Sequence, residues 1–297
     1  MREQSAAPPT STPLACSSLS CSPASHLADT HVADALIADA SGDFAYAARA
    51  LRRALAREPL HAYAHETLGC LELEAGVATD QRLRIAWALD PHHLGALVHA
   101  ARDLAMSGRI TEAIALLGDV DRSAAQQGQP PVIEAALMRA RLAAWTRDAA
   151  LARATLVRVA DVEHVAVGAI MMIARGVTGD CTHEELRAFL DQLLALPTSP
   201  KRRGFILQVY VELIARSDPE AAAGHLLSAA QLPLADLRWL DACPALDDLR
   251  EHPSFRIARA IVDVRVRDAF GDARRSEKND DDADATEQGI PTARARP

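Results

Sequence analysis

Glycine and proline recur at a nearly fixed interval through the first half of the chain. Gly42, Gly76 and Gly108 are separated by 34 and 32 residues, and Pro59 and Pro91 by 32. Breakers at this spacing divide the chain into segments of helical length. A period of this size is typical of stacked helix hairpins, in which each hairpin buries its apolar face against the next.

The stretch SGDFAYAARALRRALAREP, residues 41–59, shows what one unit requires. Gly42 suits the left-handed position that ends a first helix. Ala47 and Ala54 are small where two helices are to cross closely, and Pro59 ends the second helix. We therefore predict a tight helical hairpin with Phe44 between its two arms.

The composition agrees with an all-α fold. Hydrophobic residues make up 49% of the chain but aromatic residues only 4%, which suits closely packed helices better than a β-sandwich. Apolar residues recur at intervals of three and four, as in the segment 186–194. Runs of alternating β-branched residues with hairpin turns are absent from the sequence.

The stretch 31–59 resembles a tetratricopeptide repeat, with Ala35, the Gly42-Asp43 turn, Phe44 and the later small residues in place. A second unit, 62–91, keeps Leu68-Gly69 and Gly76 but has Gln81 where the family wants a small residue, and its second helix or turn is short. A third unit covers 94–125. The resemblance implies a right-handed solenoid of antiparallel helix pairs.

The chain then divides into five parts. Residues 1–27 and 271–297 are rich in small, polar and charged residues, and we expect disordered tails. Residues 28–125 hold the three repeats. Residues 126–232 are expected to form degenerate helix pairs at 130–159, 162–196 and 200–230, and residues 233–270 a capping segment.

The capping segment contains LADLRWLDACPALDDLREHPSF, residues 234–255. It resembles the closing segment of repeat arrays in bacterial signalling proteins, which often carry a protein kinase or nucleotide cyclase domain upstream. Trp239 and its apolar neighbours are expected to cover the last exposed face of the array, as a solenoid end requires. Pro253 is expected to start a final helix that ends near residue 270.

The sequence lacks the motifs of the common catalytic classes. It has no G-x-G-x-x-G loop, V-A-I-K lysine, H-R-D, D-F-G, P-loop or G-x-S-x-G. We therefore expect no enzymatic activity and no cofactor. The segment 181–185 looks metal-binding, but Thr182 with Glu185 three residues later predicts a helix capping box.

Histidines leave one question open. His61 and His65 have the spacing of a two-point metal clamp, and His92, His93 and His99 follow one repeat later. No acidic residue follows His61 as in H-E-x-x-H, so ordinary turn or surface histidines are the preferred interpretation. We predict no metal site.

Charge and targeting signals are weak. The net charge is −8, which argues against nucleic-acid binding, and the five scattered cysteines suit a reducing compartment. No apolar run is long enough to span a bilayer. We expect a cytoplasmic protein without a membrane partner. Met171 and Met172 are expected in the core, and the KRR at 201–203 as a solvated helix start.

The family resemblance implies that the first helix of each repeat lines a concave groove. We call the corresponding positions the concave row: Asp29, Val32, Leu36, Asp39, Tyr63, Glu66, Cys70, Leu73, Glu74, Val98, Arg102 and Met106. The row mixes apolar residues with carboxylates, so its expected ligand is an apolar peptide or helix that carries basic residues. Reversing the charge of Glu66 and Glu74 is expected to weaken binding without loss of the fold.

The preferred function is a non-catalytic protein-interaction scaffold. A first alternative is a detached regulatory repeat module of a bacterial serine/threonine kinase or nucleotide cyclase system. A second is an enzyme with an unrecognised helical active site, which a pocket of convergent titratable groups would favour.

Overall fold

Every element of the described chain is a helix. The computed structural model describes residues 23–76, 80–164 and 166–271, and within them lie fourteen α-helices and one 3-10 helix. The predicted all-α class is confirmed. Residues 23–27 belong to the first helix, although the sequence placed them in the N-terminal tail; the rest of both predicted tails, residues 1–22 and 272–297, lies outside the described part.

The first six helices form three consecutive hairpins. They are α1 (Pro23–Ser41), α2 (Phe44–Arg57), α3 (Ala62–Glu74), α4 (Asp80–Leu89), α5 (Gly95–Met106) and α6 (Ile110–Gln126). The members of each pair pack against each other, and each hairpin contacts the next. Helix α4 has only 10 residues against 14 in α2, so the unit predicted to be irregular does have the short second helix.

The glycines at the hairpin turns have the predicted left-handed backbone. The φ angles are 93° at Gly42, 77° at Gly76 and 78° at Gly108. At the first turn, the amide of Gly42 donates to the carbonyl oxygen of Ala38 at 2.9 Å, which satisfies a carbonyl at the end of α1. Glycine therefore allows the chain to reverse direction within two residues between α1 and α2, and within three residues between α5 and α6.

Small side chains hold the first hairpin together. Ala47 and Ala54 are completely buried, and Phe44 is 2% exposed. Since alanine keeps two helix axes close, α1 and α2 can bury a continuous apolar stripe between them. The packing expected from the stretch 41–59 is confirmed.

Three further hairpins follow: α7 (Ile133–Thr146) with α8 (Ala149–Val159), α9 (Val167–Thr178) with α10 (His183–Ala195), and α11 (Pro200–Ile214) with α12 (Pro219–Gln231). Their bounds agree with the three predicted degenerate pairs. Thr182 and Glu185 form the predicted capping box at the start of α10. Met171 is 46% exposed, so the prediction that it lies in the core is wrong: it faces away from the neighbours of α9.

The chain ends in α13 (Leu237–Ala242), the 3-10 helix η1 (Pro244–Leu249) and α14 (Pro253–Phe270). The five apolar residues expected to cover the end of the array are all buried: Trp239, Leu240, Leu246, Leu249 and Phe255. Pro253 opens the final helix as predicted. Among the described helices, none combines the length and apolar character needed to cross a bilayer.

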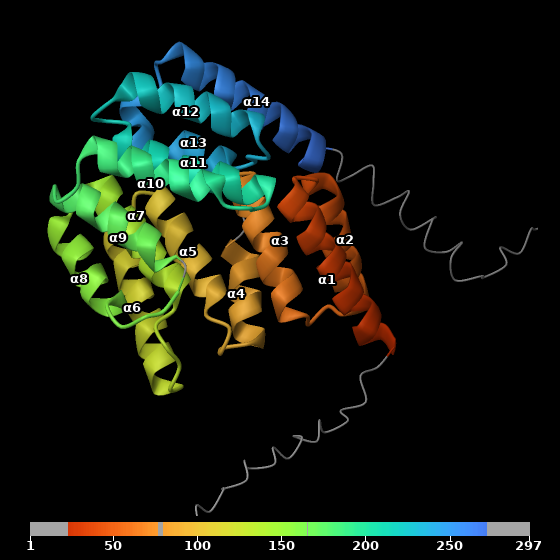
Figure 1. The fold of residues 1–297 in the computed structure, drawn as a ribbon. Helices are drawn as coiled ribbons and strands as arrows, with labels where there is room; N and C mark the ends of the chain where they lie inside the picture. Colours follow the sequence, from red (N-terminus) through yellow and green to blue (C-terminus); the bar gives the residue numbers. More distant parts are fainter. Residues whose placement is uncertain (1–22, 77–79, 165, 272–297) are drawn as a thin grey trace, which may run out of the picture.

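The last helices fold back onto the first ones. In Figure 1, α11, α12 and α14 lie across one end of the helices α1, α3 and α5, and α11 contacts α1 while α14 contacts α2. A Cβ atom at Gly42 would come within 2.3 Å of the Pro233 Cβ. Gly42 therefore serves both the turn and the close approach of a segment far along the chain.

We predict that Trp239→Ala lowers the free energy of unfolding by about 3–5 kcal/mol, as for other buried large aromatic residues. The indole also donates from Nε1 to the buried Glu212 carboxylate at 2.8 Å. Trp239→Phe keeps most of the apolar volume and should lose only about 1–3 kcal/mol, from the missing donor. Urea denaturation measures both; equal stability of Trp239→Ala and the wild type would refute the capping role.

Candidate functional site

The concave row lies on α1, α3 and α5, but α11 covers part of it. Asp29 and Tyr63 are exposed and Leu36 is 37% exposed, whereas six other members of the row are buried: Val32, Glu66, Leu73, Val98, Arg102 and Met106. Asp39, Cys70 and Glu74 are partly buried. The row therefore comes together on three neighbouring helices, with its solvent-facing part toward the starts of α1 and α3.

Lys201 lies at the covered end of the row. Its Nζ atom is 2.7 Å from Asp39 Oδ1 and 3.2 Å from Glu74 Oε2, and lies 5.5 Å from the centre of the Phe44 ring. Both carboxylates stand at the C-terminal ends of helices, where a cation is also favoured by the helix dipole. The expectation that Lys201 belongs to a solvated helix start is wrong, because its amine is used to join α11 to α1 and α3.

Burial and charge have opposite effects on the pKa values of Lys201 and Glu74. Burial alone would lower the pKa of Lys201, but the carboxylates of Glu74 and Asp39 raise it above its ordinary value. Burial raises the pKa of Glu74, and Lys201 opposes that rise. Lys201 thus supplies from within the chain the basic group that the concave row was expected to find on a partner.

Glu66 is also engaged inside the chain. Its carboxylate contacts His93 Nε2 and lies 3.9 Å from His99 Nε2. Burial raises the pKa of Glu66, and His93 opposes the rise. Because Glu66 is 5% exposed and Glu74 is paired with Lys201, reversing these charges would disturb the fold itself rather than a solvated surface.

A charged cleft of about 170 Å³ opens between α3, α5, α7 and α11. Asp236 accepts from Arg102 and, at 2.8 Å, from Gln208; Arg141 donates to Glu212 at 3.0 and 2.6 Å. The cleft does gather titratable groups, as a catalytic pocket would. Here these cations and carboxylates are joined in ion pairs that hold α11 and the segment before α13 against α5 and α7.

On its other side, α11 borders an apolar groove with a volume of about 400 Å³. We define the apolar groove by the helix faces that line it: Ala166, Ala169, Met172 and Ile173 at α9; Leu186, Phe189, Leu190, Leu193, Leu196, Pro197 and Thr198 at α10 and the following loop; and Arg202, Phe205, Ile206, Val209, Tyr210 and Leu213 of α11, with Leu137 of α7. Of the apolar residues in α10 itself, only Leu190 is buried.

The groove follows from incomplete packing of α10. This helix presents apolar residues at helical spacing on one face, yet makes only sparse contacts with α9 and α11. The sequence showed the helical spacing in 186–194, but it did not indicate that this face would stay uncovered. The signal that would have found the groove is the combination of this stripe with the continuously apolar segment of α9.

The histidines singled out in the sequence have other partners. His61 caps α3 by accepting from the Ala64 amide at 3.2 Å, and its Nε2 lies 3.2 Å from Asp29. His65 Nε2 lies 2.8 Å from the Pro59 carbonyl oxygen. Within the described ranges, no three His, Cys, Asp or Glu side chains are placed to hold a metal ion.

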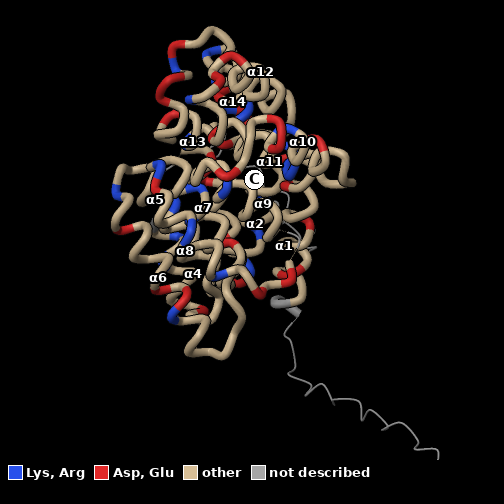
Figure 2. The backbone as a smooth tube through the Cα atoms, turned by 60° about the vertical axis from the view of Figure 1, so that its left-hand side comes forward, with Lys and Arg blue, Asp and Glu red and all other residues tan. Residues whose placement is uncertain are grey.

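Charged residues of both signs are distributed over the helices. Figure 2 shows basic and acidic residues interspersed around α5, α6 and α8.

Comparison with known proteins adds no assignment: no protein-family model matches the chain, and no curated protein sequence matches it.

We predict that Lys201→Met lowers the free energy of unfolding by about 1–3 kcal/mol at neutral pH, because two carboxylates lose their cation. The effect is smaller than for a fully buried pair, since 26% of the Lys201 side chain reaches solvent. Loss of Lys201 raises the pKa of Glu74 further, so the folded state binds a proton more readily than the unfolded state does. The stability lost in Lys201→Met should therefore become smaller as the pH falls through the raised pKa of Glu74.

Lys201→Arg is the matched control, because it keeps the charge. Chemical denaturation of both variants from neutral to acidic pH tests the prediction. Equal stability of the two variants at pH 7 would show that the ion pairs contribute nothing to the closure.

Proposed function

We propose that this chain is a non-catalytic interaction scaffold that binds a helical segment of a partner protein in the apolar groove. The observation that supports the proposal best is the groove itself: three helix faces of apolar residues converge on an open volume of about 400 Å³. Open apolar surface of this extent is typical of binding sites.

The shape of the groove favours a helix. Along α11, the lining residues run from Arg202 to Leu213, which corresponds to about 16 Å or three turns. Along α10, they recur at Leu186, Phe189 and Leu193, the spacing of one helix face. An amphipathic helix with apolar residues at i, i+3 or i+4 and i+7 would fit between these stripes.

The charge at the groove indicates which kind of amphipathic helix it would bind. Arg202 is the one lining residue with a formal charge. Among the described residues, its guanidinium has no hydrogen-bond or ion-pair partner, since only its backbone amide bonds, to Ser199. We therefore propose that the partner helix carries an acidic residue at the Arg202 end. The basic partner expected from the concave row is less favoured, because Lys201 and His93 already face those carboxylates.

We also propose that the helix hairpins are tetratricopeptide-like repeats in a right-handed array. The support is the combination of left-handed glycines at the turns, buried alanines at the crossings and hairpins at the predicted bounds. The return of α11 and α14 onto α1 and α2 distinguishes this chain from an open solenoid.

Cross-linking in lysate followed by mass spectrometry can supply a partner, and titration with the purified partner then tests the groove. Leu193→Asp places a charge in the middle of the groove and should weaken the Kd at least about tenfold. Val157→Asp is the matched control, since Val157 is 78% exposed on α8 and lies outside the groove. Arg202→Glu, at an exposed site, should weaken binding and reverse its salt dependence.

Two results would oppose the proposal. One is a partner that binds Leu193→Asp and Arg202→Glu as tightly as the wild type. The other is a set of cross-links that maps to the exposed part of the concave row, at Asp29 and Tyr63, with none at α10 or α11. Melting temperatures of all variants separate loss of binding from loss of fold.

A further inference from the structure

A second cavity, of about 500 Å³, lies where three hairpin turns meet. Its lining comes from the turn between α7 and α8, the turn between α9 and α10, the turn between α11 and α12, and the helix ends beside them. We call it the turn cavity; its lining residues are Ala144, Arg147, Gly176, Val177, Cys181, His183, Leu186, Leu213, Arg216, Ser217 and Asp218. Unlike the apolar groove, it is bordered by polar and charged side chains.

The turn cavity has more basic than acidic groups. Arg147 and Arg216 come from two different turns, and His183 from the first turn of α10; Asp218 is the one lining carboxylate. Arg216 is held in position by a bond to the Pro244 carbonyl oxygen at 3.1 Å and by Asp248 at 4.0 Å. Burial, followed by Glu185, raises the pKa of the Cys181 thiol, so this residue adds no negative charge near neutral pH.

The carboxylates around the cavity accept hydrogen bonds from backbone amides. Asp148 accepts from the Leu151 amide at 2.9 Å, and Asp218 from the Ala221 amide at 3.0 Å, so each caps a helix. Glu185 accepts from the Thr182 amide at 2.8 Å. None of these three acids pairs with Arg147 or Arg216, although the second oxygen of Asp218 lies 3.9 Å from His183 Nε2.

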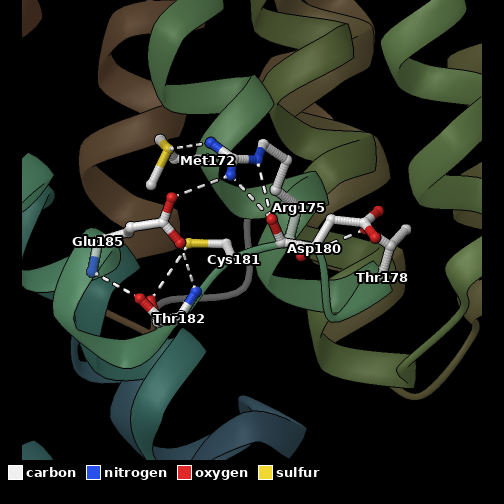
Figure 3. A network of polar contacts seen from close by, with 7 residues as sticks. All are labelled: Met172, Arg175, Thr178, Asp180, Cys181, Thr182 and Glu185. Atoms are coloured by element: carbon white, nitrogen blue, oxygen red, sulfur yellow. Dashed lines mark hydrogen bonds and ion pairs between the residues drawn. The ribbon is translucent and has the colours of Figure 1, made fainter.

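The turn between α9 and α10 is also rigid. Figure 3 shows Arg175 reaching across it: the guanidinium donates to the Asp180 carbonyl oxygen at 2.8 Å and pairs with Glu185 at 3.2 Å. Thr178 donates to the Asp180 carboxylate at 2.6 Å. This network fixes the wall that carries Cys181 and His183, so the cavity is formed before any ligand arrives.

Arg147 is unusual in its backbone. It has φ 56° and ψ 33°, and among the described residues it is the one non-glycine residue with a positive φ. Gly42, Gly108 and Gly179 occupy the left-handed position at other hairpin turns, and glycine adopts that conformation without strain. Its guanidinium makes no hydrogen bond or ion pair with any described residue. The Arg147 backbone thus caps the end of α7, while its exposed side chain leaves a cation at the cavity.

We propose that the turn cavity binds a phosphate group, with Arg147 and Arg216 as its ligands and His183 beside them. Arg147 and Arg216 line the cavity from different turns, and two guanidinium groups match the several oxygens of a phosphate dianion better than the two oxygens of a carboxylate. A cavity of about 500 Å³ also leaves room for an esterified group. The proposal does not depend on partner binding in the apolar groove.

The experiment is calorimetric titration of the full chain with inorganic phosphate, phenyl phosphate and acetate at constant ionic strength. The wild type should bind both phosphates saturably and more tightly than acetate. Arg147→Gly should weaken the Kd for phosphate at least about tenfold. The same variant should keep or raise the melting temperature, because glycine relieves the positive φ. Arg153→Gln, an exposed arginine on α8 outside the cavity, is the control and should bind like the wild type.

Each result of the titration supports or overturns the proposed phosphate site. Tighter binding of phenyl phosphate assigns the site to a phosphate ester, and equal binding to the free ion; both support the proposal. No saturation at millimolar phosphate, or one Kd shared by the wild type and Arg147→Gly, overturns it. Arg216→Gln is a second variant that should also lose phosphate binding.

Discussion

The second half of the molecule depends on the contacts that the buried Glu212 carboxylate makes with Arg141 and Trp239. Its side chain is completely shielded from solvent, and it accepts from Arg141 at 3.0 and 2.6 Å and from Trp239 Nε1 at 2.8 Å. These bonds join α11 to α7 and α13. Since a buried carboxylate that loses its partner destabilises a protein by roughly 3–5 kcal/mol, the packing of each of these helices stabilises the packing of the other two. Together with the Lys201 and Gln208 contacts, these bonds set the position of α11 and of the surfaces that it borders.

Helix α11 separates two chemically different surfaces. One face turns toward the charged cleft and the other toward the apolar groove, and Phe205 and Leu137 line both. The Phe205 ring lies 5.4 Å from the Arg141 guanidinium, so the ion pair and the groove share a wall. Leu186 and Leu213 in turn line both the groove and the turn cavity. A ligand in either place would therefore rest on the same helix that closes the fold.

Local features were predictable because their physics is local. The glycine turns, the capping box at Thr182 and the hairpin bounds each depend on a few residues close in sequence. Side-chain partners were not predictable in the same way. Lys201 looked like one of three solvated basic residues, yet it pairs with a carboxylate 162 positions away. Met171 looked like a core residue because a continuously apolar segment does not indicate which of its faces will be covered.

By itself, the sequence determined the class of the fold, the helix hairpins and their turns, since helical periodicity, caps and glycine conformation act over one unit. Only the tertiary structure decided that α11 closes over the ends of α1 and α3, that Arg102 meets Asp236 from 134 positions away, and that α10 keeps an apolar face open. The physical reason is that these outcomes depend on how hairpins stack. Stacking sums many weak contacts between distant segments, and such a sum leaves no periodic pattern in the chain.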